Sequence, residues 1–344
     1  MDNYKLTYAI IKTAVENGIR YIKDNPKRGV RNLLDLGEYF AQGRFQKIFF
    51  ELAHEILTNE NSCYYDIIED IIKNTNHDTI ANYGIDIGYN SFTYGANIIR
   101  EHEKKNGYNV PWVIVLNFEK RYENHITCEE FSNLITNGKK IGIYSYMILL
   151  NDNREILDEV LAAVKNNPDC AFMIFLNPDI LTDDMAAKIS KATNICIPVL
   201  IENNPDDNDE VLDKIKLLRK YKCFYGSFAY YDDTNVSNIS NGVIARKTLS
   251  IGSNFAILIR KKDLSHEVLN NTYDYIYKSR TKINTPVCFM DFYGDIARID
   301  NIISEESFFL SIDSLGQATV SNLYSKKTDY NIRTSTLEEI LSNL

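Results

Sequence analysis

Seven short apolar runs that recur between residues 113 and 292 constrain the fold of this chain more than any other feature of its sequence. Their first residues are separated by 24 to 32 positions, the length of a strand, a helix and two loops. Runs that are apolar almost throughout indicate strands of a parallel sheet that helices cover on the outside. Six or seven such units favour an α/β barrel, although a doubly wound open sheet remains an alternative. The runs are 113–116, 143–150, 171–175, 195–201, 224–230, 255–259 and 287–292.

The segment before these runs is expected to be helical. Apolar residues spaced by four, three and four positions lie on one helix face, namely Phe45, Phe49, Leu52 and Ile56. Residues 86–95 are rich in glycine, asparagine and aromatic residues, so they are predicted to form a loop or turn against the next domain. We therefore predict a helical N-terminal domain over residues 1–108.

The segment after the last run has the pattern of a β-hairpin. Two short strands are predicted at 308–312 and 317–320, joined by a turn at 313–316, and the tail from 335 to 344 is predicted to be a short helix. The predicted fold is therefore α/β: a (β/α) TIM-type partial barrel over 109–295, preceded by the helical domain and followed by a C-terminal hairpin tail over 296–344.

Charge and hydropathy narrow the classes of partner. The chain carries 47 acidic and 38 basic residues, for a net charge of −9, which makes nucleic acid a poor partner. A basic stretch at 260–262 is explained more simply as the solvated end of a strand. No apolar run reaches membrane-spanning length and no secretory signal begins the sequence, so we expect a cytoplasmic protein without a membrane partner.

The cysteines and histidines form no metal-binding motif. The six cysteines are at least 26 residues apart, and the five histidines include no pair at helical i,i+4 spacing. Several cysteines lie within apolar runs, where a free thiol behaves as a small hydrophobic side chain. We assign no metal ligand and expect no disulfide framework.

Several segments together resemble one known family. From about residue 12 to residue 341 the chain resembles radical-SAM proteins that carry a helical N-terminal extension and a cysteine-bearing C-terminal tail. Their order and spacing over almost the whole chain carry the resemblance: 109–112 (NVPW), 142–146 (GIYSY), 167–177 (NPDCAFMIFLN), 290–292 (MDF), 310–316 (LSIDSLG) and 331–333 (NIR).

The chain departs from this family where the family's chemistry resides. A C-x-x-x-C-x-x-C loop after the first strand should bind a [4Fe–4S] cluster and S-adenosylmethionine, but residues 117–126 form a shortened segment without cysteine. The Gly-Gly-Glu-Pro turn after the second strand is replaced by residues 150–153 (LNDN), which removes the backbone freedom that glycine allows. Ile302 and Ser321 stand where auxiliary-cluster cysteines are expected. We expect no cluster and no radical catalysis; S-adenosylmethionine binding has no support from these residues.

Any remaining function should lie at the carboxyl ends of the strands, where barrel proteins bind and react. Helix caps and loop polar groups are the simpler explanation of the polar residues there. A hard divalent cation between Asp152, Asp179 and Glu202 is one alternative, and a small molecule between Tyr146, Tyr225 and Tyr230 is another. We assign no catalytic residue; the candidate pocket rim consists of Asn117, Glu119, Asn151, Asp152, Asn177, Asp179, Glu202, Tyr230, Arg260 and Asp291.

Two main functional hypotheses follow. The first is a non-catalytic, cluster-free radical-SAM-like protein that binds a partner, such as a paralogous radical-SAM enzyme or a peptide. The second is an enzyme that uses the barrel mouth for cluster-independent chemistry, with S-adenosylmethionine or a nucleotide as its candidate ligand. A scaffold that acts only through its N-terminal helices is a third, and those helices could also cover the barrel mouth.

Overall fold

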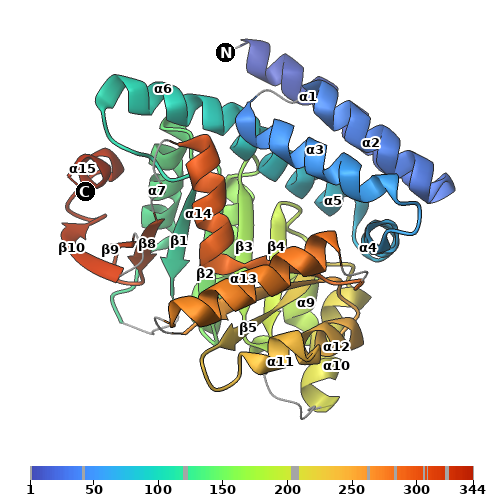
Figure 1. Cartoon of the computed structure of the whole chain (residues 1–344). Coiled ribbons are helices and arrows are strands. Elements are labelled where there is room, and N and C mark those ends of the chain that lie inside the picture. The colour runs from blue at the N-terminus through green and yellow to red at the C-terminus, as the bar shows by residue number, and fades with distance from the viewer. Residues whose placement is uncertain are drawn as a thin grey trace.

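A ten-stranded sheet forms the centre of the molecule (Figure 1). The computed structural model describes residues 2–40, 43–118, 123–202, 209–261, 264–282, 285–304, 307, 309–321 and 325–343. Each of the seven apolar runs forms a strand, and these seven strands pair in parallel and in chain order, which confirms the predicted parallel sheet. They are β1 (Val113–Asn117), β2 (Ser145–Asn151), β3 (Ala171–Leu176), β4 (Ile195–Leu200), β5 (Tyr225–Tyr231), β6 (Phe255–Arg260) and β7 (Cys288–Asp291).

The C-terminal segment extends the same sheet. Strand β8 (Phe309–Asp313) pairs in parallel with β1, as a barrel requires, and β9 (Gln317–Ser321) forms the predicted hairpin with it. An additional antiparallel strand, β10 (Ser325–Asn331), follows, and the tail ends in helix α15 (Leu337–Ser342).

Helices cover the outer face of the sheet because each presents an apolar side to it. In α8, for example, Ile156, Val160 and Val164 are buried, and α7 begins with a capping box between Thr127 and Glu130. The covering helices are α7 (Cys128–Lys140), α8 (Arg154–Asn166), η2 (Pro178–Ile180), α9 (Asp183–Ile189), α10 (Asp209–Lys220), α11 (Ser237–Ser240), α12 (Val243–Ser250) and α13 (His266–Thr281).

Aromatic contacts identify the inner face. Tyr146 and Phe172 both pack against Phe131 of α7 and therefore point outward. Side chains alternate along a strand, so Phe175 points inward. There its ring lies 5.2 Å from that of Phe228 on β5 and 5.5 Å from that of Phe292. The interior is thus packed with side chains.

The barrel is partial, because no described residues of β7 and β8 pair with each other. Helix α14 (Phe292–Ile303) lies between these strands in the chain, and side chains bind the polar groups along the free edge of β7. Arg280 Nε donates to the Phe289 carbonyl at 2.6 Å, and the Asp291 N–H donates to Asp295 Oδ2 at 2.8 Å. Arg280 and Asp295 are themselves ion-paired, so this pair replaces part of the missing strand pairing.

The N-terminal region is helical as predicted, with one correction. Residues Asp86–Gly95 form a π-helix, η1, and not a loop. One of the two glycines that suggested a loop permits close packing: a Cβ on Gly95 would lie 2.4 Å from the Gly142 carbonyl oxygen. The other helices of the N-terminal region are α1 (Asp2–Asp24), α2 (Pro26–Phe40), α3 (Arg44–Thr58), α4 (Cys63–Asn74), α5 (His77–Ile85) and α6 (Ala96–Asn106). None of the helices within the described ranges has the length and apolarity to span a membrane.

These helices lie along the amino-terminal ends of the strands, as Figure 1 shows for α4 and α5. Asn76 N–H donates to the Lys222 carbonyl at 2.8 Å, just before β5. Asn82 Nδ2 donates to Thr193 Oγ1 at 2.9 Å, just before β4, and Cys63 Sγ donates to the Thr285 carbonyl at 3.2 Å, before β7. The helical region therefore contacts the end of the sheet opposite to the barrel mouth.

Candidate functional site

We call the carboxyl ends of β1 to β8 the mouth. Four predicted rim residues are the last residues of their strands: Asn117, Asn151, Arg260 and Asp291 end β1, β2, β6 and β7. Tyr230 is the last but one residue of β5, and Asp152, Asn177, Asp179 and Glu202 follow β2, β3 and β4 closely. These nine residues thus belong to one end of the sheet, whereas Glu119 lies outside the described residues.

Several rim side chains stabilise local structure. Asn177 Oδ1 accepts a hydrogen bond from the Asp179 N–H at 3.0 Å and caps the short helix η2. Asp291 Oδ1 accepts from the Gly294 N–H at 3.1 Å and caps α14. Asp179 is exposed and lies 3.4 Å from Lys214 Nζ. These contacts agree with the simpler explanation, in which the rim polar groups are caps and surface ion pairs.

The rim carboxylates do not gather around a cation. Asp152, Asp179 and Glu202 are all exposed. Within the described ranges, no group of three or more histidine, cysteine, aspartate or glutamate residues is arranged to hold a metal ion. The suggested divalent-cation site is therefore absent from this part of the chain, and so is the convergence of acids on which the enzyme hypothesis would depend.

Asn151 adopts an unusual backbone conformation at the end of β2. Its φ of 51° lies in the left-handed region, and the pairing of β2 with β3 shifts register between Leu149 and Asn151. The Asn151 carbonyl accepts from the Asn177 N–H at 2.8 Å, which ties the ends of β2 and β3 together. Asparagine tolerates this conformation better than most non-glycine residues.

An arginine and two tyrosines form a corner of the mouth where β5, β6 and α14 meet. Arg260 and Tyr231 are paired across β6 and β5, and the guanidinium carbon of Arg260 lies 4.9 Å from the centre of the Tyr293 ring. Tyr231 is only 1% exposed. Burial raises the pKa of Tyr231 and the negative charge of Asp291 raises it further, whereas Arg260 lowers it. Burial also raises the pKa of the Asp291 carboxyl.

The sequence alone did not identify Tyr293 as part of this corner. It is the second residue of α14, a helix that was not predicted because the strand pattern ends directly before it. The signal was present, since Phe292, Ile296, Ile299 and Ile303 follow one another by four, three and four residues.

The thiols lie at the wrong end of the sheet to hold a cluster at the mouth. Cys128, the first residue of α7, follows β1 and is the only cysteine on the mouth side. The others lie at or near the amino-terminal ends of strands, or in α4 beside β7: Cys63, Cys170, Cys196, Cys223 and Cys288. Burial raises the pKa of Cys170, Cys196 and Cys223 above that of a free thiol, which disfavours the thiolate that binds iron. The residues present therefore do not fit a [4Fe–4S] cluster.

No protein-family model and no curated protein matches the sequence. Two solved structures of SuiB from Streptococcus suis are similar to the chain. The one bound to S-adenosylmethionine has a TM-score of 0.53 at 13% identity, and the other has 0.51 at 12%. Each match covers 80% of this chain and 81% of the SuiB chain. At such low identity the likeness concerns the fold alone, and it confirms the predicted fold class: an α/β partial barrel with N-terminal helices and C-terminal antiparallel strands.

Proposed function

We propose that this chain is a non-catalytic, cluster-free protein of the radical-SAM fold that binds its partner at the mouth. The position of the thiols carries the proposal: a single cysteine, Cys128, lies on the mouth side, and one thiolate cannot replace the three that hold such a cluster. The mouth nevertheless keeps ordered polar and aromatic side chains, among them Asn151, Tyr231 and Arg260, that can make contacts with a ligand.

The partner is proposed to be a peptide or a paralogous radical-SAM enzyme. The mouth presents hydrogen-bonding groups and aromatic rings side by side, which suits the mixed polar and apolar surface of a peptide. S-adenosylmethionine is the first small molecule to exclude, because one SuiB structure of the same fold holds it. Asp152 stands where the Gly-Gly-Glu-Pro turn of radical-SAM proteins carries its glutamate, but the two glycines of that turn are missing here.

Iron analysis tests the proposal directly. The chain is to be expressed anaerobically with iron and sulfide supplied, and the purified protein is to be analysed for metal and for absorbance in the visible range. We expect a colourless protein whose iron content equals that of a Cys128→Ser variant, which controls for adventitious binding by the thiol on the mouth side. S-adenosylmethionine should produce no heat of binding in calorimetry. A brown protein with near-stoichiometric cluster iron, lost in the variant, would overturn the proposal.

A further inference from the structure

Arg260 forms no ion pair at contact distance in the part of the chain that the structure describes, although, against the effect of burial, its charge lowers the pKa of the nearby Asp291 carboxyl. It is half-buried, and its guanidinium makes no ion pair and no side-chain hydrogen bond with a described residue, although it stacks on Tyr293. The neighbouring arginines differ, since both Arg280 and Arg298 are paired with Asp295. A guanidinium that has lost part of its hydration without gaining an acceptor is unfavourable unless a ligand supplies one.

Tyr231 provides a second donor beside Arg260. Most of its side chain is buried, but its hydroxyl is not one of the buried side-chain atoms that lack a hydrogen-bond partner, so the oxygen keeps contact with solvent. No hydrogen bond joins this hydroxyl to a described residue. Because Tyr231 is paired with Arg260 across two parallel strands, the two side chains leave the same face of the sheet as neighbours. Two adjacent donors, neither with a hydrogen-bond acceptor among the described residues, are therefore available to a ligand.

Asp291 is close to both residues but does not supply that acceptor. One of its oxygens caps α14 through the Gly294 N–H at 3.1 Å, and the other lies 4.0 Å from Arg298 Nη2. The carboxyl also limits the charge that the corner can accept. A doubly charged phosphate would meet one guanidinium beside an acidic side chain, whereas a planar, singly charged carboxylate matches the donor fork of one arginine.

We propose that Arg260 and Tyr231 bind a carboxylate of a peptide ligand, with Tyr293 holding the guanidinium in place. This inference rests on the proposed binding function and specifies the chemistry of its ligand. The arginine would donate two parallel hydrogen bonds to the carboxylate oxygens, and the tyrosine hydroxyl would donate a third. The carboxylate can come from a peptide C-terminus or from an acidic side chain.

The test uses two peptides that differ only in this group. Acetyl-trialanine with a free C-terminal carboxylate and the same peptide with a C-terminal amide are to be titrated against the full chain by saturation-transfer NMR, with inorganic phosphate as a third probe. Wild-type protein should bind the acid and bind the amide at least about tenfold more weakly, because charge-assisted hydrogen bonds are lost. Phosphate should not compete with the acid.

Variants assign the effect to the corner. Arg260→Gln should weaken binding of the acid by about tenfold or more, and Arg260→Lys, which keeps the charge but not the planar fork, should give an intermediate affinity. Tyr231→Phe should weaken it less. The matched control is Arg246→Gln in α12, whose exposed side chain donates to the Asn241 carbonyl, and it should bind like wild type.

Several results would overturn the inference: equal binding of acid and amide, no binding of either peptide, preferential binding of phosphate, or unchanged affinity in Arg260→Gln. Circular dichroism of each variant verifies that the fold is kept, and Arg260→Lys remains informative if the glutamine variant is unstable. The iron analysis does not involve Arg260. A cluster-free protein that does not bind the peptide with a free carboxylate would therefore refute this inference and leave the proposed function standing.

Discussion

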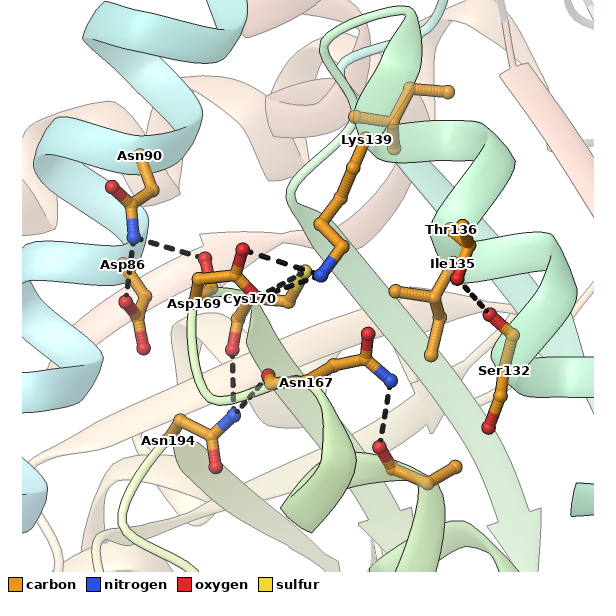
Figure 2. A network of polar contacts seen from close by, with 12 residues as sticks. Asp86, Asn90, Ser132, Ile135, Thr136, Lys139, Asn167, Asp169, Cys170 and Asn194 are labelled. Atoms are coloured by element: carbon orange, nitrogen blue, oxygen red, sulfur yellow. Dashed lines mark hydrogen bonds and ion pairs between the residues drawn. The ribbon is translucent and has the colours of Figure 1, made fainter. Parts of the chain in front are cut away.

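Asp86 offers the sharpest test of how the helical region is held against the sheet. It is the first residue of η1, it is fully buried, and its Oδ1 accepts from Asn90 Nδ2 at 2.9 Å. Its Oδ2 has no hydrogen-bond partner among the described residues. Figure 2 shows how the same Asn90 nitrogen reaches the Asp169 carbonyl, at 3.0 Å, and how the Asp169 carboxylate lies beside Lys139.

This environment favours the protonated form of Asp86. Burial is the main reason that its pKa rises to about 8 from an ordinary 3.8, and the charge of Asp169 raises it further. The hydrogen bond from Asn90 and the charge of Lys12 oppose the shift. Between these two pH values the folded chain keeps a proton that the unfolded chain has lost. Stability should therefore fall as the pH rises from about 4 to 8, and the loss should stay constant above pH 8.

The replacement Asp86→Asn should abolish this loss. Each pKa unit corresponds to about 1.4 kcal/mol, so the shift sets an upper bound on the order of 5 kcal/mol at pH 8. Relaxation around the buried charge reduces that bound, and we expect the variant to be more stable than wild type by at least about 2 kcal/mol at pH 8. Near pH 4 the two proteins should be equally stable, because asparagine keeps the acceptor for Asn90.

Urea unfolding followed by circular dichroism at about pH 5 and pH 8 measures the difference. The control is Asp274→Asn on the exposed side of α13, which should leave the pH dependence as in wild type. An Asp86→Asn protein whose unfolding free energy still falls between pH 5 and pH 8 as in wild type would refute the reasoning, as would equal destabilisation at both pH values.

Two further predictions concern packing and the free strand edge. Arg280→Ala should lower the free energy of unfolding by about 2 kcal/mol, because it removes one of the two arginines paired with Asp295 and the hydrogen bond to the Phe289 carbonyl. Lys216→Ala in an exposed pair should change it by less than about 0.5 kcal/mol, and similar urea midpoints for the two variants would contradict this. Gly95→Ala should destabilise the chain because its Cβ would clash with backbone oxygens, whereas Gly84→Ala, with open space around it, should stabilise by about 0.5–1 kcal/mol. A stable Gly95→Ala protein in thermal melts would disprove the close contact.

The sequence predicted those parts of the fold that depend on local pattern. Near-continuous apolar runs marked β1 to β7, seven of the eight described strands that pair in parallel, since a strand buried on both faces needs apolar residues throughout. The π-helix over 86–95 was missed because its stability comes from distant partners: Asn90 bonds to Asp169, and Ser91 bonds to Ser145 at 2.8 Å. From the sequence alone Gly95 indicates a turn, and only the structure shows that the segment around Gly142 packs too closely for a side chain there.

The candidate site shows the same division. The rim residues could be placed at one end of the sheet because parallel strands end together. Whether their side chains converge depends on turns and ion pairs that no spacing encodes. Asp179 lies beside Lys214, 35 residues away, and so does not approach Asp152 as a metal ligand would. Arg260 and Tyr231, in contrast, do lie side by side, because the register of β5 and β6 pairs them, and the sequence does not reveal that register.

The two ends of the sheet differ in what a polar group finds there. At the amino-terminal end, the helical region packs against the sheet, Asn90 donates to the Asp169 carbonyl, and five of the six thiols lie at that end. At the mouth, Arg260 and Tyr231 have donors without acceptors among the described residues. Unmet polar groups thus occur at both ends: the buried Asp86 Oδ2 lies inside a packed contact, where its cost is felt as lost stability, whereas the donors of Arg260 and Tyr231 lie at the mouth, where a ligand can supply an acceptor. This asymmetry is why we expect changes at Asp86 to act on stability and changes at Arg260 to act on recognition.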